Sequence, residues 1–232
     1  MTAASTALSE QMWSTTAQDR LGRAAPGRGR AAPGRAGPPL RRGGPGRRCR
    51  AALGLGTEFT AGIVDQVEVD LLEAALRALP DADGLLRARV LARLAKALLF
   101  SPAAGRRLAL SGQAAAMARR LGDPATLAAV LYDRHLAIWG SPEAEVAGER
   151  LAIATEVVRL AEAIGDREMA LRGRGLRRSD LLEQGDIAGF EADLAASEET
   201  ARQVRQLHYR WQLPLARPRP PCWPAASARP RR

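Results

Sequence analysis

The tetrapeptide Leu121-Gly122-Asp123-Pro124 joins a helix-ending signal to a helix-starting signal. Glycine adopts the left-handed conformation that closes many helices. Aspartate caps the following helix through its side-chain oxygen, and proline is favoured at the first helical position. The motif recurs less completely as Ile164-Gly165-Asp166-Arg167. Each copy therefore predicts a tight turn between two helices.

The two copies lie 43 residues apart, and apolar residues on both sides follow the same spacing. It aligns Leu108 with Leu151 and Leu194, Leu121 with Ile164 and Leu207, Ala114 with Val157, and Met117 with Leu160. A helical hairpin repeat of this length cannot bury its own apolar face and has to stack on its neighbours. We therefore expect an all-α, TPR-like α-solenoid in which Leu108, Leu151 and Leu194 are all buried.

Apolar residues at spacings of three and four predict the individual helices. The expected helices run over about 63–79, 86–98, 102–121, 124–139, 142–164, 167–184 and 187–206. Pro80 ends the first, whereas Ser101-Pro102 and Ser141-Pro142 each supply a cap and a first-turn proline. No run alternates with period two, so no strand is predicted. A right-handed array of antiparallel helices is expected.

Charge divides the chain into a body and two tails. Residues 1–50 hold 10 arginines against Glu10 and Asp19, and residues 214–232 hold 5 arginines and no acid. Of the 35 basic and 25 acidic residues in the chain, 51–213 therefore keeps 20 and 23. We expect a helical repeat domain over 51–213 between two disordered tails, because segments of arginine, glycine, alanine and proline bury too little apolar surface to fold.

Three interpretations of the tails stay open. The first is that they are passive. The second is that they bind nucleic acid through their arginines, although residues 20–50 hold no aromatic side chain for base stacking. The third is that they are frameshifted translation of GC-rich DNA, because alanine, arginine, glycine and proline have codons with G or C at both of the first two positions.

Cysteine usage and hydropathy indicate the cellular compartment that we expect for the protein. Cys49 and Cys222 are too isolated for a disulfide framework or a zinc site, which favours a reduced, cytoplasmic protein. The N-terminus has no secretory signal pattern, and no window approaches a run of about 18 apolar residues. No membrane partner is therefore expected.

No catalytic, cofactor-binding or metal-binding residue is predicted, and we expect no enzyme. A phosphate-binding loop needs glycines before a lysine, but the one lysine, Lys96, lies in the helical run LARLAKALL. Gly54-Leu55-Gly56 is interpreted as a loop. Of the two histidines, His208 carries no motif, and His135 is expected to pack between helices. Residues two apart in a helix do not face each other, so Asp133 is not expected to hydrogen-bond His135 and make it a general base.

Two charged clusters are interpreted as ordinary helix surface. The first is a group of carboxylates expected to be solvated: Glu191, Asp193, Glu198 and Glu199. The second is the dense basic cluster of the body, Arg172, Arg174, Arg177 and Arg178, three of which share a face. A phosphate or acidic-partner patch is conceivable there, but Glu168, Asp180 and Glu183 offer neutralising partners at helical spacing. Trp139 is expected to anchor the core.

The body, about residues 50–213, resembles the helical, tetratricopeptide-like repeat region of large actinobacterial signalling ATPases. These include ATP-binding LuxR-type transcriptional regulators and ATPases coupled to adenylate or guanylate cyclases. The phrases that carry the resemblance include RAALGLG (50–56), ARRLGDPATLAAVLYDRHLAIWG (118–140) and ERLAIATEVVRLAEAIGDREMALRGRGLRRSDLLEQGD (149–186). The nucleotide-binding and effector domains of the family have no counterpart here, and the strict Trp-x-x-Leu-Gly-x-x-Tyr signature is missing.

The resemblance implies a sensor or scaffold piece of a regulatory ATPase, without ATPase or output activity. We expect a protein-interaction repeat module that binds a protein or peptide partner through its helices and needs no cofactor. The alternative is a nucleic-acid-binding protein that acts through its basic tails.

The end of the body is expected to lack a partner helix. The prolines that follow forbid a helix of any length: Pro214, Pro218, Pro220 and Pro221. The apolar face of 187–206, with Leu194, Val204 and Leu207, would then lose half its cover. We expect marginal stability or self-association through this end.

Overall fold

The computed structural model describes residues 45–54, 62–139, 144–204, 209 and 213, and this part of the chain is all helical. Its helices are α2 (Pro45–Gly54), α3 (Gln66–Ala78), α4 (Leu85–Ala97), α5 (Ala104–Leu121), α6 (Pro124–Ala137), α7 (Ala144–Ala163), α8 (Arg167–Glu183) and α9 (Ile187–Gln203). The described ranges contain no strand, so the predicted all-α class is confirmed for them.

The glycine–aspartate turns form as their sequence predicts. Gly122 and Gly165 have φ angles of 69° and 71°, the left-handed conformation that ends α5 and α7. Asp123 and Asp166 cap α6 and α8, because each side chain accepts a hydrogen bond from the backbone N–H three residues further on, at 2.8 and 2.9 Å. The Gly185-Asp186 turn before α9 repeats this geometry.

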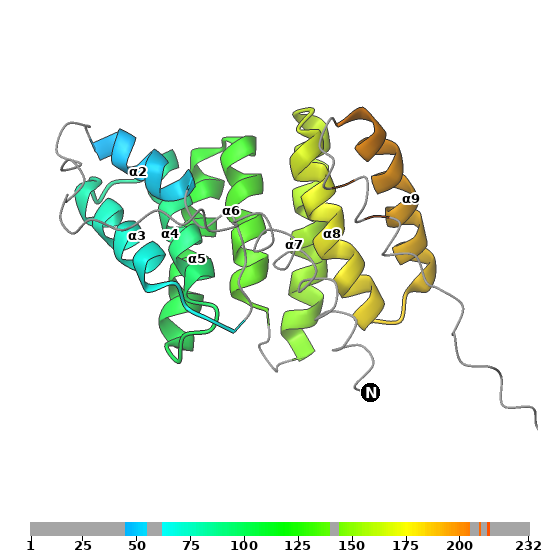
Figure 1. Ribbon diagram of the computed structural model, residues 1–232, viewed down its shortest axis with the longest axis horizontal. Helices are drawn as coiled ribbons and strands as arrows, with labels where there is room; N and C mark the ends of the chain where they lie inside the picture. Colours follow the sequence, from blue (N-terminus) through cyan, green and yellow to red (C-terminus); the bar gives the residue numbers. More distant parts are fainter. Residues whose placement is uncertain (1–44, 55–61, 140–143, 205–208, 210–212, 214–232) are drawn as a thin grey trace, which may run out of the picture.

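The helices stack in chain order along the long axis of the molecule (Figure 1). Each helix packs against the next one in the chain, and α7 and α8 share the most extensive contact. The even-numbered helices also contact one another, α2 with α4, α4 with α6, and α6 with α8. The described odd-numbered helices make no comparable contacts with each other. We call α2, α4, α6 and α8 the inner layer and α3, α5, α7 and α9 the outer layer.

The prediction that Leu108, Leu151 and Leu194 are all buried is wrong. Leu194 is 5% exposed and Leu151 is half-buried, but Leu108 is 39% exposed. Helix α5 packs only on α4 and α6, and it turns Arg107 and Ser111 toward them instead. Without a neighbouring outer helix, the opposite face of α5 stays exposed. The other aligned pairs, Ala114 with Val157 and Met117 with Leu160, are all buried.

The predicted boundary between residues 50 and 51 is wrong, because α2 spans it. Cys49 and Ala52 are buried and pack with Val69 and Leu72 of α3. The Cys49 thiol also donates to the Ala75 carbonyl oxygen at 3.7 Å. Overall composition predicted disorder here, but the short apolar stripe of α2 is enough to join the core. The rest of the predicted tail, residues 1–44, lies outside the described residues.

The apolar face of α9 has more cover than expected. Leu213 is 5% exposed and belongs to one buried cluster with Phe190 and Leu194, against which Tyr209 packs. The predicted loss of cover is therefore wrong for Leu194, because Tyr209 and Leu213 supply cover from beyond α9. Leu207 and residues 214–232 lie outside the described part. No helix among the described residues is long and apolar enough to cross a membrane.

Candidate functional site

A small cavity opens on the inner layer between α4, α6 and α8, with α2 at its edge. Its volume is about 40 Å³. We call it the inner cavity, and it is lined by Leu53, Arg89, Arg93, Ala129, Tyr132, Asp133, Met169 and Arg172. The lining combines three arginines, one carboxylate and one phenol with three apolar side chains.

Arg93 ties three inner helices together at the cavity. Its Nε atom donates to Asp133 Oδ2 at 3.1 Å, and its Nη1 atom donates to the Leu53 carbonyl oxygen at 3.3 Å. The side chain of Asp133 is only 7% exposed, and its Oδ1 atom has no hydrogen-bond partner among the described residues. The site therefore holds a buried carboxylate that is half satisfied.

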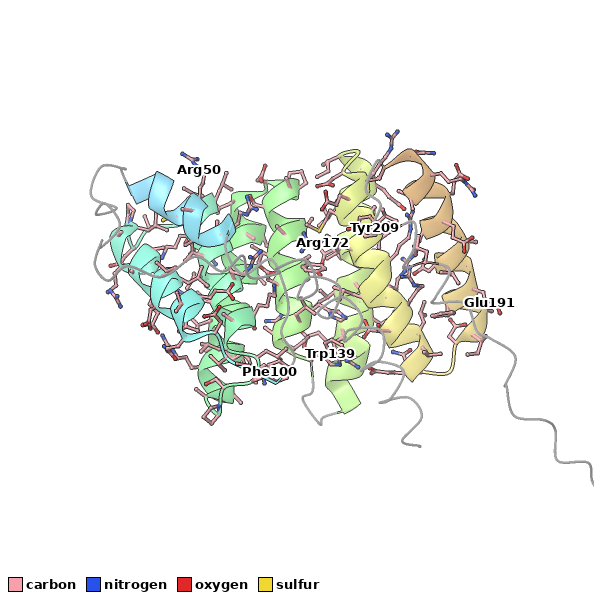
Figure 2. The ribbon with its side chains drawn as sticks, viewed as in Figure 1. Arg50, Phe100, Trp139, Arg172, Glu191 and Tyr209 are labelled. Atoms are coloured by element: carbon pink, nitrogen blue, oxygen red, sulfur yellow. The ribbon has the colours of Figure 1, made fainter. Side chains whose placement is uncertain are left out.

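Arg172 reaches the cavity from α8 and lies over the ring of Tyr132, with its guanidinium carbon 4.3 Å from the ring centroid. This distance is within the range of a cation–π contact. Figure 2 shows Arg172 and Tyr209 at a similar height in the view, and the two side chains interact electrostatically. Burial raises the pKa of Tyr209 to about 12, so this phenol stays neutral at physiological pH.

Two more charged side chains interact electrostatically with Arg93 and Asp133. Lys96 of α4 is 7% exposed, and burial lowers the pKa of its ammonium group even though Asp133 and Glu68 oppose the shift. Burial also raises the pKa of Glu68, against the opposing charges of Lys96 and Arg93. Both shifts have the same cause, since burial penalises whichever form is charged.

A second buried polar cluster connects α6, α7 and α8. His135 Nε2 lies 2.7 Å from Asp180 Oδ2, and the two side chains are 2% and 1% exposed. Arg150 Nε lies 3.7 Å from Asp180 Oδ1, and Arg150 also pairs with Glu183. His135 therefore hydrogen-bonds between helices as expected. With both members shut off from solvent, the pair is placed to hold helices together rather than to meet a substrate.

Two arginines of the basic cluster of α8 form ion pairs, but not with the predicted residues of their own helix. Arg174 pairs with Glu162 of α7, and Arg177 pairs with Asp193 of α9 at 2.6 Å. Arg178 donates to Ser197 Oγ at 2.7 Å, and burial lowers the pKa of Arg178 to about 10. Arg172 points away from these three, toward Tyr132. Helical spacing alone did not show that neighbouring helices supply the partners.

The carboxylate cluster of α9 is split by burial. Asp193 is 5% exposed, so the prediction of a solvated side chain is wrong there because Arg177 draws Asp193 into the α8–α9 interface. Glu191 and Glu199 are exposed, and Glu198 is half-buried. Trp139 packs against a small buried cluster that includes Leu136 and Leu176, in agreement with its predicted role.

The described residues contain no group of three histidine, cysteine, aspartate or glutamate side chains placed to hold a metal ion. Lys96 lies within α4, and Gly54 ends α2. Residues 55 and 56 and His208 are outside the described part. A second, wider hollow of about 470 Å³ runs along α7 beside Leu151 and Arg159, but all of its lining residues come from that one helix.

Sequence analysis considered Arg172 and Asp133 separately, but it did not bring the residues of the inner cavity together. Arg93 and Lys96 interrupt the apolar run of α4, and Asp133 interrupts the one between Leu131 and Leu136 in α6. Charged residues inside an apolar stripe were the sequence signal that could have indicated the cavity.

Comparison with protein-family models, curated proteins and solved structures finds no match.

Proposed function

We propose that the chain is a non-catalytic helical-repeat module that binds a protein or peptide partner through its inner layer. The observation that carries this proposal is the inner cavity, to which α4, α6 and α8 each contribute polar side chains. Functional side chains on successive stacked helices form an extended surface that suits a chain-like ligand. The resemblance to the repeat region of regulatory ATPases supports the same function, and we propose that the chain is a sensor or scaffold piece of such a protein, acting in the cytoplasm.

An α-solenoid architecture is part of the proposal. It is supported by the 43-residue interval, at which not only the turns but also contacts between helices recur. Arg107 binds the Ala137 carbonyl oxygen, and Arg150, 43 residues later, pairs with Asp180, 43 residues after Ala137. The non-catalytic assignment draws on the burial of His135, which leaves the arrangement most like an acid–base pair out of reach of substrate.

A peptide selection against the full chain tests the proposal. Peptides enriched from a random display library are synthesised and titrated in solution. We expect them to bind the wild type and to lose most of their affinity for Tyr132→Ala, because Tyr132 lines the inner cavity. They should bind Arg159→Ala as tightly as the wild type, because Arg159 is exposed on outer helix α7. Equal binding to all three proteins would refute an inner-layer site.

Nucleic-acid binding through the tails is the competing outcome. Such binding would weaken steeply as salt rises and would depend little on sequence. It would also be lost on removal of residues 1–44, the segment before α2. Oligonucleotide binding with these properties, together with failure to select any peptide, would replace the proposal with this alternative.

A further inference from the structure

The inner cavity concentrates positive charge on a body that is mildly acidic. Arg89, Arg93 and Arg172 line it against a single carboxylate, Asp133. Within the described part of the chain, neither Arg89 nor Arg172 forms an ion pair. Apolar walls beside these charges reduce solvent screening and focus the field in the cavity. The cavity is therefore electropositive.

Two of the arginines are held in place before any ligand arrives. Arg93 is fixed by Asp133 and by the Leu53 carbonyl oxygen, contacts that use two of its five N–H donors. Arg172 is held by its contact with Tyr132, whose ring centroid lies 4.3 Å from the guanidinium carbon. A guanidinium fork that is already oriented loses less entropy when it binds an oxyanion.

The size of the cavity limits the group that enters it. A water molecule needs about 10–15 Å³ of such space, so a cavity of about 40 Å³ admits a group of about three heavy atoms. A carboxylate has that size, whereas a sugar ring or a nucleoside does not.

The buried carboxylate of the cavity orients the arginine beside it. Asp133 is more than nine-tenths buried, and its Oδ2 atom accepts a hydrogen bond from Arg93 Nε at 3.1 Å. This contact leaves other N–H donors of Arg93 for a ligand. The carboxylate of an acidic side chain matches the positive charge and the size of the cavity.

We propose that the inner cavity binds the carboxylate of an aspartate or glutamate side chain in an acidic peptide segment of the partner. Arg89, at the exposed rim, attracts the acidic segment, and Arg93 and Arg172 bind the carboxylate by charge-assisted hydrogen bonds. This inference rests on the proposed partner-binding function and specifies the chemistry that the inner layer recognises.

Fluorescence anisotropy with three labelled peptides tests the inference at fixed ionic strength. The peptides share a glycine–serine background and carry Asp and Glu, or Asn and Gln, or phosphoserine at the same positions. We expect the acidic peptide to bind the full-length wild type at least about tenfold more tightly than the amide peptide. Replacing Arg89 and Arg172 with glutamine should remove that preference.

The matched control replaces two exposed arginines of outer helices, Arg77→Gln and Arg159→Gln, and so makes the same change in net charge. The tails are identical in every variant, so their attraction for acidic peptides cancels. We expect the control to keep the preference. Arg89→Gln alone, at an exposed position, should weaken binding of the acidic peptide without disturbing the fold, which thermal melts would check.

Each contrary result overturns a defined part of the inference. Equal affinity for acidic and amide peptides, or equal losses in the site and control variants, would refute carboxylate binding. Tighter binding of the phosphoserine peptide would replace the carboxylate by a phosphate. If peptides from the display selection require Tyr132 but lack acidic residues, the inner-layer function stands and the carboxylate assignment fails. If they do not require Tyr132, the proposed function itself fails.

Discussion

Gly173 lies on α8 where that helix packs directly on α7, and replacing it with alanine tests how tightly the two helices fit. A Cβ atom at this position would lie 2.8 Å from Val157 Cγ1, 3.1 Å from Val158 Cγ2 and 3.3 Å from the Val158 backbone nitrogen. Val157 is fully buried, and a β-branched side chain in a helix has one strongly preferred rotamer. The clash can therefore be relieved only by moving α7 away from α8.

Two opposing effects set the change in the free energy of unfolding that Gly173→Ala causes. Alanine in place of glycine inside a helix gains about 1 kcal/mol of helix propensity, whereas an extra methyl group in a packed interface costs about 1–3 kcal/mol. We expect Gly173→Ala to lower the free energy of unfolding by about 1 kcal/mol net. Gly175 in the same helix has no heavy atom within 4 Å of the corresponding Cβ. Gly175→Ala should therefore raise the free energy of unfolding by about 0.5–1 kcal/mol.

Urea unfolding and thermal melts, both followed by circular dichroism, measure both variants. The two melting temperatures should move in opposite directions, by about 2–4 °C per kcal/mol for a chain of this size. Val157→Ala removes the clashing methyl group, so it should be less damaging in the Gly173→Ala background than in the wild type. Changes of the same sign at both glycines, or no coupling to Val157, would refute the close packing of α7 on α8.

Three further predictions concern buried polar and apolar positions. Asp180→Ala leaves the buried imidazole of His135 without its hydrogen-bond partner and should cost about 1–3 kcal/mol in urea unfolding, whereas Glu199→Ala on the exposed surface of α9 should leave the midpoint unchanged. Cys49→Asp buries an unpaired carboxylate and should lower the melting temperature clearly more than Arg50→Asp, which is exposed; equal effects would show that α2 does not pack. Burial raises the pKa of Glu68, so its contribution to stability is present below pH 4.5 and is lost as the pH rises through the folded-state pKa. Glu68→Gln should therefore stabilise the chain at pH 7, with an advantage that shrinks toward pH 4.5; an advantage independent of pH would contradict the shift.

Local sequence alone determined the helices between residues 66 and 203 and the glycine–aspartate turns between them. It misplaced the start of α5, which begins at Ala104 after Ala103 rather than at the predicted Ser101-Pro102 cap. The Gly122-Asp123 and Gly165-Asp166 turns formed where predicted because glycine conformation and aspartate capping act within a few residues. Prediction failed at α2, where composition suggested disorder. A stripe with Cys49 and Ala52 is too short to be recognised alone, and it is buried only because α3 and α4 present apolar surface to it.

Only the tertiary structure decided which charged residues lie inside. Arg93 pairs with Asp133, which lies 40 residues later in the sequence, and His135 pairs with Asp180, which lies 45 residues later. Helical periodicity carries no information over such sequence separations. The exposure of Leu108 was decided in the same way, by outer helices that do not touch each other. A stripe of apolar residues shows that a helix face is buried. Only the packing of neighbouring helices determines which polar side chains on that face find hydrogen-bond partners. The inner cavity is formed by that packing.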